Sequence, residues 1–145
     1  MELRLFSADD WSWVQEWYQD ALLDRELGPM DTDWLDAVLA ERDGVQLVAM
    51  IEAKPIALIG CVWGTEQHPS HHITDIAVAP SMRGQGLASK VLHQVVAWPG
   101  HPYTSKWTAF VNPRNLQAQS LLRKNLWAEV GVFEGMMHFE KSITT

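Results

Sequence analysis

The sequence predicts an α/β domain of the α+β kind, with a mixed, mostly antiparallel central sheet of about seven strands and about four flanking helices. Three observations predict it: short apolar runs of strand length, apolar residues at helical spacing between them, and a glycine-rich turn that joins a central strand to a helix. The chain has 145 residues, 47% of them hydrophobic, which is enough for one core. We therefore expect residues 1–145 to form a single domain.

The first elements are predicted from alternation and from helix-capping residues. Residues 2–6 alternate polar and apolar side chains, which indicates a strand. Ser7 is a typical helix N-cap, and the helix that it begins is expected to extend to about Asp20. After the breaking sequence LGPM, a second helix, capped at Asp31 or at the next residue, is expected to end at Gly44.

Apolar density and chain-breaking residues place the remaining elements. Two dense apolar runs, separated by a short turn, indicate an antiparallel hairpin. A third run precedes the glycine-rich turn, and a segment with helical apolar spacing follows it. The expected strands cover residues 45–52, 55–63, 71–79, 105–111, 127–133 and 137–141, and the expected helices cover about 87–98 and the segment after NPRN that carries Ala118, Leu121 and Leu122.

Composition excludes several classes of function. The net charge of −7 argues against a nucleic-acid partner, and no apolar run approaches the about 20 residues that cross a bilayer. The N-terminal sequence MELRLFSADDW lacks the basic and apolar regions of a signal peptide, so a cytoplasmic location without a membrane partner is expected. The single cysteine, Cys61, allows neither a disulfide framework nor a Cys/His zinc pattern, and no metal is expected.

The stretch from Ala77 to Leu92, AVAPSMRGQGLASKVL, places glycines between a strand and a helix, where glycine normally costs stability. A helix N-terminus has unpaired N–H groups and a partial positive charge, so a glycine-rich turn there can hold a phosphate. Gly84 and Gly86 would allow the phosphate to approach the backbone, and Arg83 would add a positive charge. The alternative is a tight turn that binds no ligand.

Two common phosphate-binding motifs are absent from this stretch. The dinucleotide fingerprint requires a third glycine where Ser89 stands, and an acidic residue about 20 positions further on, where the sequence is WTAFVN. The P-loop pattern GxxxxGK[ST] does not occur. A phosphate at this turn would therefore be held in another way.

The stretch VAPSMRGQGLASKVL resembles motif A of the GNAT superfamily of N-acetyltransferases. The signature R/Q-x-x-G-x-G/A of that motif is met by Arg83, Gly86 and Ala88. Downstream, NLQAQSLLRKNLW is similar to the second motif of the family, with an asparagine, an alanine three residues later and a hydrophobic pair at the helix end. The order of elements also fits, so the resemblance covers nearly the whole chain.

The resemblance implies a domain that uses acetyl-CoA as co-substrate. In this family the fourth and fifth strands splay apart, and the pantetheine arm of acetyl-CoA lies between them. The resemblance implies that three strand residues bind the arm and the acetyl group, that the turn binds the pyrophosphate, and that one asparagine contacts the pantetheine: Ile76, Ala77, Val78, Arg83, Gly84, Gln85, Gly86, Leu87, Ala88 and Asn115.

The catalytic groups are less clear, because the chain departs from the family pattern. Where the family often has a tyrosine that protonates the departing thiolate, this chain has Leu122, so the acid is water or, as a weak candidate, Tyr103. His72, Asp75 and Glu66 are candidates for the base that receives the proton of the amine. Each also has a structural interpretation: His72 as a surface histidine, Asp75 as a hydrogen-bonded strand residue and Glu66 as the polar end of a strand.

The N-terminal third is acidic and rich in tryptophan. Residues 1–45 carry a net charge of −9, whereas the rest of the chain carries +2. Carboxylates attract cations and tryptophan faces bind them, so Trp13, Trp17 and Trp34 are candidates for an acceptor site that takes a cationic amine. Alternatively, the tryptophans form a core stripe and the acids support helix N-termini.

These observations predict an N-acetyltransferase in which an acceptor amine attacks the acetyl thioester directly in a ternary complex. The acceptor would be a small molecule or a peptide amine, and a homodimer is compatible with the sequence. The alternative is an acyl-CoA-binding module, used as a sensor or interaction domain, that does not catalyse transfer.

Overall fold

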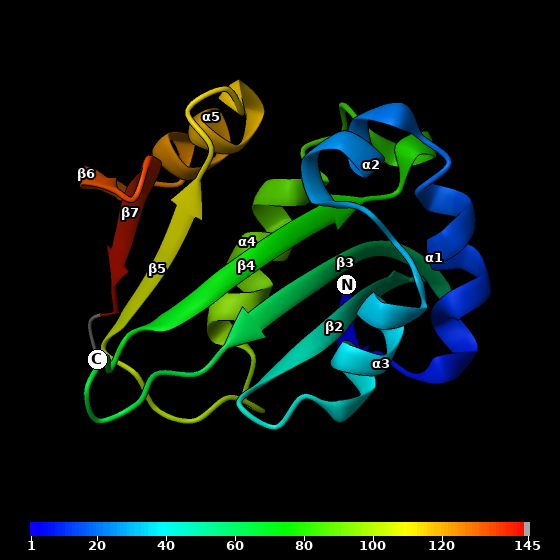
Figure 1. Cartoon of the computed structure of the whole chain (residues 1–145), viewed down its shortest axis with the longest axis horizontal. Helices are drawn as coiled ribbons and strands as arrows, with labels where there is room; N and C mark the ends of the chain where they lie inside the picture. The colour runs from blue at the N-terminus through cyan, green and yellow to red at the C-terminus, as the bar shows by residue number, and fades with distance from the viewer. Residues whose placement is uncertain (144–145) are drawn as a thin grey trace.

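The computed structural model describes residues 1–143 and confirms the predicted fold class. Seven strands form one mixed, mostly antiparallel sheet in the order β1-β2-β3-β4-β5-β7-β6 (Figure 1). The strands are β1 (Glu2–Leu5), β2 (Gly44–Ile51), β3 (Lys54–Val62), β4 (His71–Val78), β5 (Lys106–Val111), β6 (Ala128–Phe133) and β7 (Met136–Ser142). The α-helices are α1 (Trp11–Trp17), α2 (Ala21–Leu27), α3 (Thr32–Ala40), α4 (Leu87–Ala97) and α5 (Leu116–Lys124).

The sheet opens between β4 and β5, its one parallel strand pair within residues 1–143. These strands pair at two positions, where His71 lies opposite Trp107 and His72 lies opposite Thr108. Beyond these pairs the strands diverge, and Figure 1 shows α2 and α5 on opposite sides of the open end. The predicted splaying of the fourth and fifth strands is therefore present, and it leaves the β5-facing edge of β4 without a strand partner after His72.

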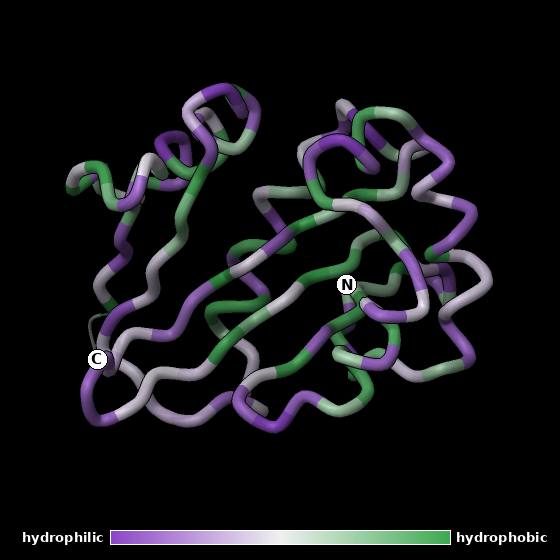
Figure 2. The backbone as a smooth tube through the Cα atoms, viewed as in Figure 1, coloured by the Kyte–Doolittle hydropathy of each residue, from purple (hydrophilic) through white to green (hydrophobic). Residues whose placement is uncertain are grey.

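Each face of the sheet carries its own hydrophobic core. On one face, α4 and α5 pack on the sheet around the buried residues Val91 and Trp107. On the other face, α1, α2 and α3 cover a smaller cluster that includes Val14 and Leu58. Figure 2 shows hydrophobic residues along β2 and β3 and hydrophilic residues in the loop before β2. Because β4 is flanked by both cores, its successive side chains face two different environments.

The N-terminal helices differ from the sequence prediction. We expected one helix from Ser7 to about Asp20, but the structure has a 3-10 turn at Ala8–Asp10, then α1, and then a separate helix α2. The Asp20 side chain accepts a hydrogen bond from the Leu23 N–H at 3.1 Å, which makes Asp20 the N-cap of α2 and not the end of α1. The chain therefore has five α-helices within residues 1–143, one more than expected.

Within the described residues, no helix is long and apolar enough to cross a membrane.

Candidate functional site

The open end of the splayed sheet contains a cavity of about 670 Å³, which we call the main cleft. Its walls come from α2, β4, the turn between β4 and α4, the start of α4, β5 and α5. The cleft therefore lies where the strands of the central sheet separate, between the elements that Figure 1 places on either side.

The backbone conformation of the turn between β4 and α4 explains why the turn contains two glycines. Gly84 has a φ of 77° and Gly86 a φ of 72°, values in the left-handed region that glycine adopts without strain. A Cβ atom at either position would meet no atom within 4 Å, so the space in front of the turn is open. Gly86 is the N-cap residue of α4 and makes no side-chain cap, which leaves the first N–H groups of the helix facing this space.

The predicted positive charge of the turn is already paired. The guanidinium of Arg83 makes two hydrogen bonds to the Asp20 carboxylate, at 2.5 and 3.1 Å. These bonds, with the Leu23 N–H bond, hold the pKa of Asp20 below its usual value. The pair connects the N-cap of α2 to the glycine-rich turn, a link that the sequence did not predict.

Most of the residues predicted for the acetyl donor line the main cleft. Eight of the ten do so: Ile76, Val78, Arg83, Gly84, Gly86, Leu87, Ala88 and Asn115. Of the other two, Ala77 is fully buried against the core beneath α1, and Gln85 is exposed. The Asn115 side chain caps α5 by accepting the Ala118 N–H at 3.1 Å, so part of its role is structural.

Strand β4 contains a bulge at the candidate base. Asp75 lies opposite Gly60 of β3, whereas Ile73 lies opposite the next residue, Cys61, so Thr74 is the extra residue. A Cβ atom at Gly60 would approach both the Asp75 carboxylate and the Thr74 hydroxyl to less than 3.0 Å. Gly60 is therefore required here because both polar side chains lie over it.

The carboxylate of Asp75 is enclosed and hydrogen-bonded, although the residue as a whole keeps some exposure to solvent. It accepts hydrogen bonds from the Thr74 hydroxyl at 2.9 Å and from the Gln46 amide at 3.3 Å. Burial raises the pKa of Asp75 above its usual value, and the hydrogen bonds from Thr74, Gln46 and the backbone of Gly60 oppose this rise. Asp75 is thus a hydrogen-bonded strand residue, and because it also lines the main cleft, it remains a candidate base.

His72 lies where β4 and β5 are still paired, and it does not line the main cleft. Its Nδ1 is hydrogen-bonded to the Thr108 hydroxyl, and its ring stacks on Phe110 with centroids 5.8 Å apart. Burial lowers the pKa of His72, and the nearby His138 lowers it further. The ring is therefore neutral near pH 7 and held in place by its neighbours.

The structure does not bring Glu66 or Tyr103 to the main cleft. Glu66 is exposed in the loop between β3 and β4, beyond the end of β3 at Val62, so it is not the polar end of that strand. Tyr103 lies before β5, at the end where β4 and β5 are paired, and its side chain is 78% exposed. Leu122, at the position of the expected tyrosine, is buried and lines the cleft.

The tryptophans of the N-terminal third divide into two groups. The Trp13 indole N–H donates to the buried Asp10 carboxylate at 2.9 Å, and Trp13 packs on Trp17 with ring centroids 4.5 Å apart. Neither ring lines the main cleft. Trp34 stacks on Trp11 at 5.9 Å and lines a second, smaller cavity. The core interpretation thus describes Trp13 and Trp17, whereas Trp34 borders a cavity.

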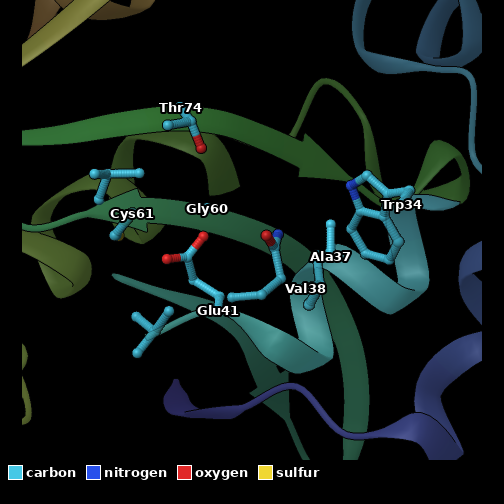
Figure 3. A pocket seen from close by; sticks show the side chains of 10 residues that line it. Trp34, Ala37, Val38, Glu41, Gly60, Cys61 and Thr74 are labelled. Atoms are coloured by element: carbon cyan, nitrogen blue, oxygen red, sulfur yellow. The ribbon is translucent and has the colours of Figure 1, made fainter. Parts of the chain in front are cut away.

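The second cavity, which we call the α3 pocket, has a volume of about 110 Å³ and lies between α3 and the sheet. Figure 3 shows Thr74 on one side of the pocket, Glu41 on the other and Trp34 at one end. Thr74 lines both this pocket and the main cleft, so the two cavities adjoin at the β4 bulge.

The sequence analysis missed the residues that surround Asp75. Thr74, Gly60 and Gln46 come from three separate strands, and only the fold brings them together around the carboxylate. No local signal identifies them, because a bulge between two strands leaves no recognisable sequence pattern. Among residues 1–143, no group of three or more His, Cys, Asp or Glu side chains could hold a metal ion.

Known structures share this fold along nearly their whole length. The aminoglycoside acetyltransferase AAC(6')-Ib in complex with coenzyme A and kanamycin matches with a TM-score of 0.79 and 20% identity, over 97% of this chain and 93% of the other. Spermidine N-acetyltransferase from Vibrio cholerae in complex with CoA and spermine matches with a TM-score of 0.78 and 14% identity, over 97% and 94% of the two chains. A GNAT-family acetyltransferase from Streptococcus agalactiae matches with a TM-score of 0.79 and 17% identity, over 99% and 96%.

This chain thus has the fold of these acetyltransferase structures. The model of the acetyltransferase (GNAT) family matches residues 9–126, and the chain belongs to this family. The resemblance seen in the glycine-rich turn is therefore confirmed. A comparison with curated protein sequences finds no significant match.

Proposed function

We propose that this protein transfers the acetyl group of acetyl-CoA to the amine of a cationic acceptor, by direct attack in a ternary complex. The observation that carries the proposal is the continuity of the main cleft, which runs from the glycine-rich turn past the unpaired edge of β4 to Asp75. One end offers free backbone N–H groups to a pyrophosphate, and the other offers a carboxylate to an amine.

The donor would lie along the unpaired edge of β4. After His72, backbone N–H and C=O groups on this edge have no strand partner, so an extended pantetheine arm can take the place of a strand. The backbone of Ile76, Ala77 and Val78 would hold the arm and the acetyl group, and the turn from Arg83 to Ala88 would hold the pyrophosphate. An N–H of β4 near the acetyl carbonyl would stabilise the oxyanion that develops there.

The amine would react on the side of β4 that carries Asp75. The carboxylate takes a proton from the acceptor ammonium, the neutral nitrogen attacks the thioester carbon, and the carbon–sulfur bond breaks with the electron pair on sulfur. The nitrogen of the new amide then loses its extra proton to water. Burial raises the pKa of Asp75, which makes its carboxylate a stronger base than that of an exposed aspartate. Because Leu122 cannot donate a proton, the CoA thiolate leaves as an anion or is protonated by water.

A panel of primary amines tests this function, with release of the CoA thiol as the readout. We expect acetyl-CoA to be consumed in the presence of cationic amines and not of neutral or anionic ones. Leu122 at the position of the usual acid favours the alternative of an acyl-CoA-binding module that does not catalyse. That alternative predicts acetyl-CoA binding without consumption for every amine in the panel.

A further inference from the structure

The α3 pocket adjoins the proposed reaction centre. Gln46 and Thr74 both line the pocket, and both donate hydrogen bonds to the Asp75 carboxylate. Asp75 itself lines the main cleft. An acceptor whose amine reaches Asp75 would therefore have the α3 pocket directly beside it, on the face of the sheet that α3 covers.

The pocket combines apolar walls with a single carboxylate. Val38, Val45 and Val62 supply apolar wall surface, and Trp34 closes one end (Figure 3). The one acidic side chain that lines the pocket is that of Glu41, and no basic residue lines it. Such a lining suits a short alkyl chain that ends in a positive charge.

The carboxylate of Glu41 is available to a ligand. The residue is exposed, and one of its oxygens accepts the Asp43 N–H at 2.8 Å. Among residues 1–143, no lysine or arginine forms an ion pair with Glu41. A cation in the pocket would thus meet a carboxylate that is positioned by the backbone and has no competing partner.

The size of the pocket limits what it can hold. An apolar cavity of about 150 Å³ can bind benzene, and the α3 pocket, at about 110 Å³, is smaller. No residue of α3 is fully buried, which agrees with a helix that leaves space between itself and the sheet. The pocket is thus suited to the end of a short alkylammonium chain.

We infer that the α3 pocket binds the second ammonium group of a diamine acceptor, with Glu41 as its counter-ion. The reacting amine would lie at Asp75, a short alkyl chain would pass Thr74, and the distal ammonium would face Glu41. The substrate class is therefore a primary amine on a short alkyl chain that ends in a second amine, either free or as part of a longer polyamine. This inference rests on the proposed acetyltransferase function for the position of the reacting amine.

The test compares 1,4-diaminobutane with 1-aminobutane, which has the same chain and lacks the second charge. For the wild type, we expect kcat/KM to be higher for the diamine. Glu41→Gln should lower kcat/KM for the diamine by about tenfold and leave that for the monoamine unchanged, since one charged contact is lost. The glutamine can still accept the Asp43 N–H, so the end of α3 is retained.

Asp36→Asn is the matched control. Asp36 is exposed on the same helix, does not line the pocket, and its replacement changes the net charge by the same amount. We expect this variant to retain the preference for the diamine. Ala37→Leu, which extends a lining side chain into the pocket, should remove the preference as Glu41→Gln does.

Calorimetric titration of 1,4-diaminobutane in the presence of CoA separates this inference from the proposed function. Binding that weakens in Glu41→Gln, in a protein that acetylates no amine, would support the pocket and contradict the acetyltransferase proposal. Acetylation of amines with equal diamine preference in the wild type and in Glu41→Gln would support the enzyme and overturn the pocket. No preference for the diamine over the monoamine, in either binding or turnover, would also overturn it.

Discussion

The two ends of the main cleft are built in different ways. We call the end at the turn between β4 and α4 the donor side, and the end at Asp75 the acceptor side. The turn between β4 and α4 is one continuous stretch, and its chemistry follows from two glycines with left-handed backbone and the free N–H groups of the next helix. The side that carries Asp75 combines residues from α3, β2, β3 and β4. A site made of consecutive residues is visible in a sequence, whereas a site assembled by the sheet is visible only in the fold.

Charge distinguishes the two sides as well, and one ion pair joins them. The N-terminal third, with a net charge of −9, supplies α2 and α3 beside the acceptor side. The one arginine of the glycine-rich turn, Arg83, is paired with Asp20 of that acidic segment. The pyrophosphate site that we propose would thus depend on backbone N–H groups more than on free side-chain charge, and variants of the two sides should have separable effects.

The largest effect is expected at the acceptor side, from Asp75→Asn. Loss of a general base lowers turnover by about 100-fold or more, whereas affinity for CoA should remain within a small factor of the wild type. In the wild type, kcat/KM should rise with pH through a value above the usual aspartate pKa, since burial raises the pKa of Asp75 and the base acts when deprotonated. In Asp75→Asn this acid limb should disappear.

Asp36→Asn serves here too as the control for the change in charge, and it should keep both the rate and the pH profile of the wild type. If Asp75→Asn also kept the parent rate and pH profile, the base would be solvent or the free-amine equilibrium of the substrate.

The next prediction concerns Leu122, which we expect to stabilise the fold and not to take part in proton transfer. Leu122 is 5% exposed, so Leu122→Ala should reduce the free energy of unfolding by about 2 to 4 kcal/mol. Leu116→Ala, at a leucine of the same helix that is 69% exposed, should change it by less than about 0.5 kcal/mol. Denaturant unfolding measures both. Markedly faster turnover of a folded Leu122→Tyr variant would contradict this account, because it would show that the absence of an acid at this position limits the reaction.

Gly86→Glu should act on the donor side alone. The new carboxylate would stand where we place the pyrophosphate, and affinity for CoA should fall by about tenfold or more. The control is Gly86→Asn, because asparagine tolerates the φ of 72° and adds no charge. Calorimetry with CoA measures both variants. Equal affinity of the glutamate variant and the wild type for CoA would show that this turn does not bind the pyrophosphate.

The smallest effect is expected at the ion pair that joins the two sides. Asp20→Asn removes the charge that competes for Arg83 but retains a side chain that can cap α2. Affinity for CoA should therefore rise by about threefold at low salt, and the gain should shrink as salt increases. A fall in affinity would mean that Asp20 orients Arg83 for the phosphate and does not compete for it.

The sequence predicted the sheet and the glycine-rich turn because these depend on local patterns, and the family resemblance implied the opening between β4 and β5. Alternation defined β1, apolar runs defined β2 to β4, and Gly84 and Gly86 marked the turn. It missed α2, because Asp20 was interpreted as the end of one helix when its side chain caps the next. Neither interpretation of Glu66, as a base in the cleft or as the polar end of a strand, agrees with its position in the exposed loop beyond Val62.

The acceptor side was predicted only as an acidic, tryptophan-rich region. Asp75 was one of three candidate bases, and nothing in the sequence separated it from His72. The separation comes from the β4 bulge, which directs Asp75 into the main cleft while His72 stays where the strands are paired. Trp13 and Trp17 pack against their neighbours and not around a cleft, because Asp10 and the α1 core fix them.

The most direct measurement follows thiol release and acetylated amine together, in one reaction of the wild type with acetyl-CoA and 1,4-diaminobutane. The account predicts that the two products appear at equal rates and in equal amounts, and that Asp75→Asn slows both by the same factor. Thiol release without acetylated amine would indicate hydrolysis. Bound acetyl-CoA with no release of thiol would indicate a module that binds the donor without using it, and either result would contradict the account.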